Sequence, residues 1–134
     1  MSKDFLQSLF EYLSSNTELK KIVGSNIYPM YIPQYDKIPA VVYYPVSTNY
    51  DTEFENDTGF MRVIIQFDCH ETTFKKARIL SRLIKKMFQD FHGDMKGTNI
   101  QASFIRSDFI INDTSNNKFD ATDSIHVLEF EFFI

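Results

Sequence analysis

Two short stretches of the chain carry residue types that could do chemistry. The tripeptide Asp57-Thr58-Gly59 has the residue order of the aspartic proteases. In that chemistry two carboxylates share one proton in a rigid, apolar turn. Here the tripeptide follows Glu53 and Glu55 in a polar segment that we expect to be solvated. Extra acids in water do not make a paired-carboxylate site, so the pattern argues against an acid protease.

The run Asp68-Cys69-His70-Glu71 contains four potential metal ligands. Side chains alternate along a strand, so Asp68 and His70 share one face while Cys69 points to the other. A structural zinc site needs four ligands, usually from two separated pairs, and the two remaining histidines are isolated in the sequence. We therefore predict no metal site and no cofactor.

Other catalytic signatures do not occur in the sequence. It has no Gly-x-Ser-x-Gly motif, no glycine-rich phosphate loop among its 4 glycines, and no EF-hand spacing in the acidic segment 51–57. The prediction is that the chain is not an enzyme. The alternative from the enzyme class is a small hydrolase that uses Asp57, or Asp68 with His70.

Composition indicates one folded domain over residues 1–134. Hydrophobic residues make up 43% and aromatic residues 16%, with 14 Phe and no Trp, so phenyl rings should build the core. A net charge of −4 predicts no general affinity for duplex DNA, and the single cysteine excludes an internal disulfide. Residues 1–10 do not resemble a signal peptide, and no apolar run approaches the roughly 20 residues of a membrane span. We expect a soluble chain made in the cytosol, with no membrane contact.

The elements that must position these residues are organised around residues 61–91. Alternation from Met61 to Cys69 predicts a strand, and a polar hinge at 70–73 follows. The period then becomes helical, with a basic opposite face from Lys75 to Lys86 that we interpret as solvated. The predicted buried positions of this helix are Phe74, Ala77, Ser81, Ile84, Met87, Phe88 and Phe91.

The N-terminal part of the chain predicts helices followed by a connector. Ser2 is the expected cap of a first helix, Thr17 that of a short second one, and Gly24 its end. The prolines of residues 26–39 predict an extended connector and not a central strand. We expect the tyrosines of this connector to cover a sheet edge and not to stack on nucleic acid bases. The predicted buried stripe of the first helix is Phe5, Leu6, Leu9, Phe10 and Leu13.

Three further strands are predicted at residues 40–48, 100–111 and 125–134. Pro45 indicates an edge position or a bulge in the first, and a change of parity predicts a bulge near Arg106-Ser107 in the second. Gly93 and Gly97 frame a turn, and residues 49–59 and 112–124 are polar loops. The predicted class is α+β: an antiparallel or mixed sheet of about four main strands with two helices on one face.

The order of these pieces resembles the tail completion, or tail terminator, proteins of long-tailed bacteriophages. The resemblance covers nearly the whole chain and rests on the order and spacing of short motifs. These are Leu19-x-x-Ile22-Val23-Gly24, Asn26-Ile27-Tyr28-Pro29, Pro33-Gln34, Ile38-Pro39-Ala40-Val41-Val42-Tyr43, Val63-Ile64-Ile65-Gln66-Phe67-Asp68, and Ala77 within the long helix. The sequence departs from the family pattern at His70, where an aromatic residue often stands, and its second polar loop is long.

The resemblance implies a protomer of a ring, expected to be hexameric, that caps the head-proximal end of the tail tube. Its implied partners are the tail tube protein and the head connector or stopper protein, and DNA passes through the ring without specific binding. Its implied location is the virion tail, after assembly in the host cytoplasm. Another head–tail connector or neck protein is the alternative.

The two polar loops are the long connections in the chain, and loops of such length usually have a function or are disordered. We expect the free protein to be largely monomeric, with both loops becoming ordered on the tube end. The predicted interface residues are Tyr50, Phe54, Glu55, Asp57 and Phe119.

Overall fold

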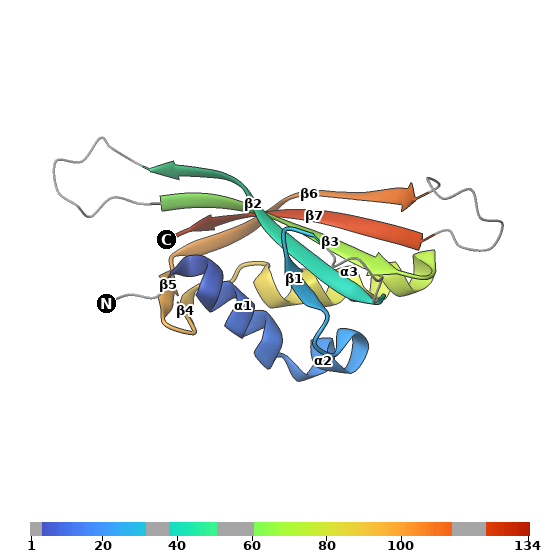
Figure 1. The fold of residues 1–134 in the computed structure, drawn as a ribbon. Helices are drawn as coiled ribbons and strands as arrows, with labels where there is room; N and C mark the ends of the chain where they lie inside the picture. Colours follow the sequence, from blue (N-terminus) through green and yellow to red (C-terminus); the bar gives the residue numbers. More distant parts are fainter. Residues whose placement is uncertain (1–3, 32–37, 51–60, 114–122) are drawn as a thin grey trace, which may run out of the picture.

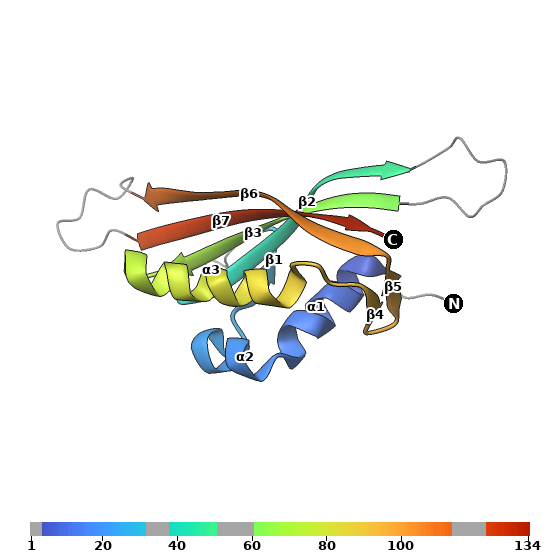
Figure 2. The same cartoon turned by 180° about the vertical axis from the view of Figure 1, so that it is seen from behind.

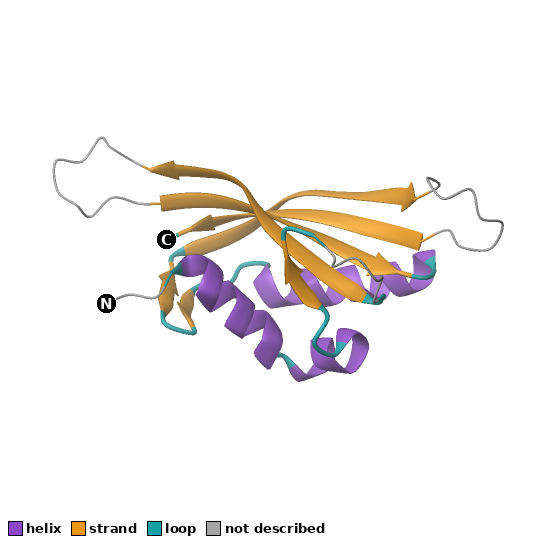
Figure 3. Cartoon of the chain, viewed as in Figure 1, coloured by secondary structure: helices purple, strands orange, loops and turns teal. Residues whose placement is uncertain are grey.

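A five-stranded sheet with three helices on one face makes up most of the structure (Figures 1 and 3). The structure is a computed structural model that describes residues 4–31, 38–50, 61–113 and 123–134. The helices are α1 (Phe5–Ser15), α2 (Thr17–Val23) and α3 (Phe74–Phe88). The strands are β1 (Ile27–Pro29), β2 (Ala40–Tyr50), β3 (Met61–Glu71), β4 (Gly93–Met95), β5 (Thr98–Ile100), β6 (Ala102–Asp113) and β7 (Asp123–Phe133).

The main sheet is mixed, in the order β1-β2-β3-β7-β6. Only β1 and β2 are parallel, and every other neighbouring pair is antiparallel. The predicted α+β class is confirmed. The described part of the sheet has five strands where about four were expected, because residues 27–29 form the short strand β1. The short second helix predicted before Gly24 is present as α2, so three helices lie on the face where two were expected.

The predicted strand and long helix at the centre of the chain are present as β3 and α3. Val63, Ile65, Phe67 and Cys69 are buried on the helix-covered face. β3 continues through Glu71, where a hinge was expected, because β7 pairs with it as far as Ser124. The Thr73 side chain caps α3 by accepting a hydrogen bond from the Lys76 N–H at 3.2 Å.

The helix α3 differs from its prediction at both ends. It ends at Phe88, three residues before the expected Phe91, and Asp90 has a positive φ of 57° that is incompatible with a continuing helix. Phe74, expected in the core, is 52% exposed at the first helical position, where its ring meets the Arg78 guanidinium. Leu80 and Leu83 supply buried side chains that the prediction omitted.

Phenyl rings form the core, as the composition predicted. Phe88 of α3 is fully buried, and its ring lies 4.9 Å from that of Phe67, 5.9 Å from Phe130, 5.6 Å from Phe132 and 5.5 Å from Tyr12. Each well-oriented aromatic pair contributes about 0.5–1.5 kcal/mol beyond the burial of its area. Phe88 therefore joins α3 to both central strands and to α1.

The caps of the first two helices are not those predicted. Asp4 is the N-cap of α1, and the predicted cap Ser2 lies outside the described residues. Asn16, not Thr17, caps α2, because its Oδ1 accepts a hydrogen bond from the Leu19 N–H at 2.9 Å. Phe10, expected in the buried stripe, is 41% exposed. Gly24 ends α2 as predicted, with φ 61°.

Residues 27–29, predicted as a connector, form the short edge strand β1. It pairs only with Val41, Val42 and Tyr43 of β2. Beyond it, the Met30 N–H donates to the Tyr43 carbonyl at 3.0 Å. The other half of β2 has no neighbouring strand on that side among the described residues.

Both predicted bulges are present, and they lie at one level of the sheet. The pairing register shifts between Pro45 and Ser47 on β2, and between Ile105 and Ser107 on β6. Pro45 lies opposite Ile65 of β3, which lies opposite Phe130 of β7, which lies opposite Ile105. The strands that flank the central pair β3 and β7, namely β2 and β6, therefore have their bulges at the same level of the sheet.

A small hairpin, β4–β5, replaces the simple turn predicted between Gly93 and Gly97. Its turn uses positive φ at Lys96 (47°) and Gly97 (105°), as tight hairpins require. The hairpin lies at the N-terminal end of α1 (Figure 2). The hydroxyls of Thr98 in the hairpin and Ser8 in the helix lie 2.7 Å apart. Ile100 therefore belongs to β5, and the main strand begins at Ala102.

Candidate functional site

The predicted interface residues lie almost entirely outside the part of the chain that the structure describes. Tyr50 is the last residue of β2, and its side chain is not described. Phe54, Glu55, Asp57 and Phe119 lie outside the described residues. Their predicted role in an interface, and the protease-like tripeptide at Asp57, are therefore untested by the structure.

The four potential metal ligands at 68–71 diverge, as strand alternation predicted. Cys69 is fully buried in the core, and burial raises the pKa of its thiol far above the ordinary value. Glu71 is 5% exposed and accepts a hydrogen bond from the Thr72 N–H at 3.0 Å. Within the described ranges no three His, Cys, Asp or Glu residues are grouped as metal ligands.

Asp68 belongs to a polar cluster on the helix-free face of the sheet. The Gln66 amide donates to Asp68 Oδ1 at 2.9 Å and also contacts the Tyr44 hydroxyl, which lies 3.4 Å from Asp68 Oδ2. Partial burial, followed by the negative charge of Asp68, raises the pKa of Tyr44. Glu129 also raises it, so this carboxylate is close to the cluster. The middle of the helix-free face is therefore acidic and hydrogen-bonded.

A second polar cluster connects α3 to the edge of the sheet. His126 of β7 is 6% exposed, and its Nδ1 lies 3.2 Å from the hydroxyl of Ser81 on α3. Its Nε2 contacts the Asp108 carboxylate of β6, which also pairs with the Lys85 ammonium. Partial burial works against ionisation of Asp108, but hydrogen bonds from Lys85 and His126 outweigh it and lower the pKa of this carboxyl.

The contact order Ser81–His126–Asp108 is that of a hydrolase triad, but its surroundings do not suit catalysis. Ser81 is 1% exposed, and its hydroxyl also lies 3.0 Å from the Arg78 carbonyl of its own helix turn. A nucleophile must reach a substrate carbonyl, and this oxygen lies beneath the helix. The cluster is a buried polar link between α3 and the two strands.

Sequence reasoning missed this cluster because its members lie 18 to 45 positions apart. One available signal was parity. His126 has the same strand parity as Leu128, Phe130 and Phe132, so it faces the core and needs polar partners there.

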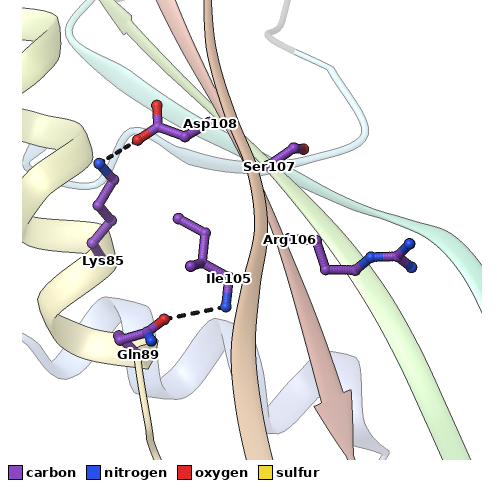
Figure 4. A pocket seen from close by; sticks show the side chains of 6 residues that line it. All are labelled: Lys85, Gln89, Ile105, Arg106, Ser107 and Asp108. Carbon is purple, nitrogen blue, oxygen red and sulfur yellow. Dashed lines mark hydrogen bonds and ion pairs between the residues drawn. The ribbon is translucent and has the colours of Figure 1, made fainter.

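A groove of about 450 Å³ lies beside this cluster, between α3 and β6. It is lined by Lys85, Gln89 and the segment 105–108 (Figure 4). Gln89 Oε1 accepts a hydrogen bond from the Ile105 N–H at 3.1 Å across it, and Lys85 pairs with Asp108. The Arg106 side chain points away from α3 and pairs with Glu131 at 3.2 Å. The groove's charged groups are thus already paired.

The structure describes part of the tyrosine-lined sheet edge and the basic face of α3, both of which the sequence analysis considered. Tyr28 donates to Asn26 Oδ1 at 2.8 Å at the sheet edge, as an edge-covering role requires, whereas Tyr31 is 73% exposed. The basic face of α3 is largely exposed, as predicted. No helix in the described part of the chain is long and apolar enough to cross a membrane.

Comparison with known proteins shows similarity of fold alone. No protein-family model matches the chain, and no curated protein sequence matches it. Among solved structures, a chain from "Virion of native gene transfer agent (GTA) particle" matches with a TM-score of 0.61 at 10% sequence identity. The match covers 93% of this chain and 90% of the other. The shared fold therefore extends over nearly the whole length of both proteins.

Proposed function

We propose that this chain is a structural protein of a phage-like virion, and specifically a tail terminator. It caps the head-proximal end of the tail tube as a ring, stops tube polymerisation and presents a surface for joining the tail to the head. The observation that carries the proposal is the end-to-end fold match to a chain of a gene transfer agent virion. The match supports a protein of a virion but, at only 10% identity, it does not reach the narrower role of tail terminator. That role rests on the sequence resemblance.

Three of the motifs that carry the resemblance, at residues 19–24, 26–29 and 38–43, are adjacent in space, whereas Pro33-Gln34 lies outside the described residues. The segment that ends in Gly24 is α2, Ile27–Pro29 is β1, and the motif 38–43 opens β2. The Asn26 carbonyl accepts a hydrogen bond from the Val41 N–H at 3.0 Å, and its amide donates to the Pro39 carbonyl at 3.2 Å. Asn26 of one motif and Pro39 of the next, 13 positions apart, are therefore joined directly, which gives the order and spacing of these motifs a structural reason.

The charge of the chain supports a ring through which DNA passes without being gripped. The net charge is −4, and Asp68, Glu129 and Glu131 lie on the helix-free face. Carboxylates repel phosphates, so such a surface adds no general affinity for duplex DNA. In this proposal the partners are the tail tube protein, the head connector or stopper protein, and further copies of the chain in a hexamer.

The proposed role is non-enzymatic. The one Ser–His–Asp contact order in the described residues has its serine at 1% exposure, and Cys69 is buried. The rival assignment is another head–tail connector or neck protein of similar shape. It differs in what its loss does to tail length.

Electron microscopy of particles that lack this chain tests the proposal. Deletion of its gene is expected to give over-long tails, or tails that do not join heads, since nothing stops tube growth. The wild-type chain supplied in trans is the control and restores normal length. Tails of normal length together with defective heads would refute the terminator role and favour the neck protein.

A further inference from the structure

The outer edge of β6 is closed along one half and open along the other. In the closed half, the Asp90 N–H donates to the Ser103 carbonyl at 3.1 Å, and Gln89 accepts from the Ile105 N–H. Both groups come from the end of α3. The bulge between Ile105 and Ser107 marks the end of this closed half.

The backbone groups of the open half follow from the pairing register. Ile134 and Met61 exchange both backbone hydrogen bonds, so the even-numbered residues of β7 bond to β3. The odd-numbered residues of β7 bond to β6, where Glu129 lies opposite Ser107, Val127 opposite Phe109 and Ile125 opposite Ile111. Asp108 and Ile110 alternate with these residues of β6, so their N–H and C=O groups point away from β7, at the outer edge of the sheet. No strand of the described chain lies beside them.

This open half also exposes apolar side chains. Phe109, Ile110 and Ile111 are consecutive and are 44%, 39% and 46% exposed. Natural edge strands are usually shortened, charged or covered, because a long apolar edge invites pairing with another strand. The closed half of β6 is protected in this way and the open half is not.

A matching open edge lies on the far side of the same sheet. β1 covers only Val41 to Tyr43, so residues 44–50 of β2 have no outer neighbour among the described residues. Val46 there is 49% exposed. This segment and residues 107–113 of β6 are of equal length, and they lie toward opposite ends of the sheet (Figure 1).

We propose that residues 107–113 of β6 pair with residues 44–50 of β2 in a second copy of this chain. β2 and β6 run in opposite directions within a protomer, so copies related by a rotation that keeps strand direction meet as antiparallel strands. Each copy then uses one open edge and offers the other, which is the heterologous contact that closes into a ring. This inference deepens the proposed function, on which the ring itself rests.

The stagger that this pairing requires is compatible with closure. Residues that lie opposite each other share a face of the sheet, so Ile110, which lies level with Cys69 of β3, pairs with Thr48, which lies level with Val63. This pairing offsets successive copies by six positions, which is about 20 Å along the strands. The strands β2, β3, β7 and β6 separate one copy from the next and span about 19 Å, so the strand tilt is roughly 45°, at the upper end of the range of closed barrels.

Cysteine cross-linking in assembled tails tests the pairing. Chains carrying Ile110→Cys and chains carrying Thr48→Cys are mixed and treated with a short bismaleimide. Native Cys69 is fully buried and gives little background. We expect covalent dimers from the mixture and a ladder of oligomers from the double variant. Ile79→Cys, at a 50% exposed position on α3, is the matched control and should give neither.

Two results would overturn the pairing: cross-linking of the mixture no stronger than the Ile79→Cys control, or dimers of Ile110→Cys alone, which would indicate contact between two β6 edges. The same reaction is run on the concentrated purified chain. The pairing is thereby judged even where the tail-length experiment contradicts the terminator role.

A second variant separates pairing from folding. Ile110→Lys places a charge on the open edge and is expected to reduce incorporation into tails at least tenfold, with the thermal midpoint of the isolated chain unchanged. Ile79→Lys is the control and should be incorporated normally. Normal incorporation of Ile110→Lys would show that this edge is not the contact.

Discussion

Truncation of Phe88 to alanine is expected to cost the fold much of its stability. The side chain is fully buried, and its ring contacts the rings of Phe67, Phe130, Phe132 and Tyr12 at centroid distances of 4.9 to 5.9 Å. Large-to-small changes of buried phenylalanine cost about 3–5 kcal/mol, and four ring contacts place this site at the upper end. A typical domain has only about 5–15 kcal/mol to lose.

Urea unfolding followed by circular dichroism measures this loss. With a slope of about 2 kcal/mol per molar urea, the middle of the usual range, a loss of about 4–5 kcal/mol lowers the midpoint by roughly 2–2.5 M. Phe88→Leu keeps part of the buried volume but loses the four ring contacts, so its loss should fall between those of Phe88→Ala and Phe74→Ala. Phe74→Ala is the matched control, because Phe74 is 52% exposed, and should change stability by well under 1 kcal/mol.

The order of the stability losses among these variants tests whether Phe88 is the centre of the core. A loss below about 2 kcal/mol for Phe88→Ala would refute the assignment of Phe88 as the centre of the core. So would equal losses for Phe88→Ala and Phe74→Ala. In either case the cluster of phenyl rings would not be what holds α3 against the sheet.

Three other predictions follow from single contacts. The pKa of Asp108 is lowered in the folded chain, so the contribution of its carboxylate to stability is present above the ordinary carboxyl pKa of about 4 and is lost as pH falls through the folded value. Asp108→Asn should therefore lower the thermal midpoint at pH 7, and the difference from wild type should vanish in strong acid. A difference that persists in strong acid would exclude an ionic cause. Gly24→Ala should lower the free energy of unfolding in urea by about 1–2 kcal/mol, because φ is +61° at this residue. A Cβ would meet nothing within 4 Å there, so the loss would come from the backbone alone. An unchanged urea midpoint would show that the backbone is not constrained at Gly24. Cys69 should react with a maleimide at least a hundredfold more slowly in the native chain than in urea, as mass spectrometry can measure, and rapid native labelling would contradict its burial.

Periodicity was enough to predict the parts of the fold that are set by local pattern. The alternation in β3 and the central buried positions of α3, from Ala77 to Phe88, were predicted correctly because these residues face a core built from both elements. The prediction was wrong at the ends of α3, where Phe74 is exposed and Phe91 lies beyond the helix. The bulges were found because Pro45 cannot donate to a ladder and because parity reverses within β6. The α+β class then followed from two amphipathic elements that must bury their apolar faces together.

What could not be predicted depends on contacts between distant residues. The β4–β5 hairpin is too short for a periodic signal, and its position is fixed by the contact between Thr98 and Ser8 of α1. The pairing of β1 with β2 depends on Asn26, whose side chain reaches Pro39. The Ser81–His126 link joins residues 45 positions apart. The open half of β6 is visible only once α3 has closed the other half.

The alignment of the two bulges at one level of the sheet has an evolutionary consequence. Insertion or deletion of one residue in a strand normally turns every later side chain to the wrong face. A bulge absorbs such a change locally, and here both outer strands have one beside the same pair of core residues, Ile65 and Phe130. The ends of β2 and β6 can therefore change in length and facing between related chains while β3 and β7 keep the core intact.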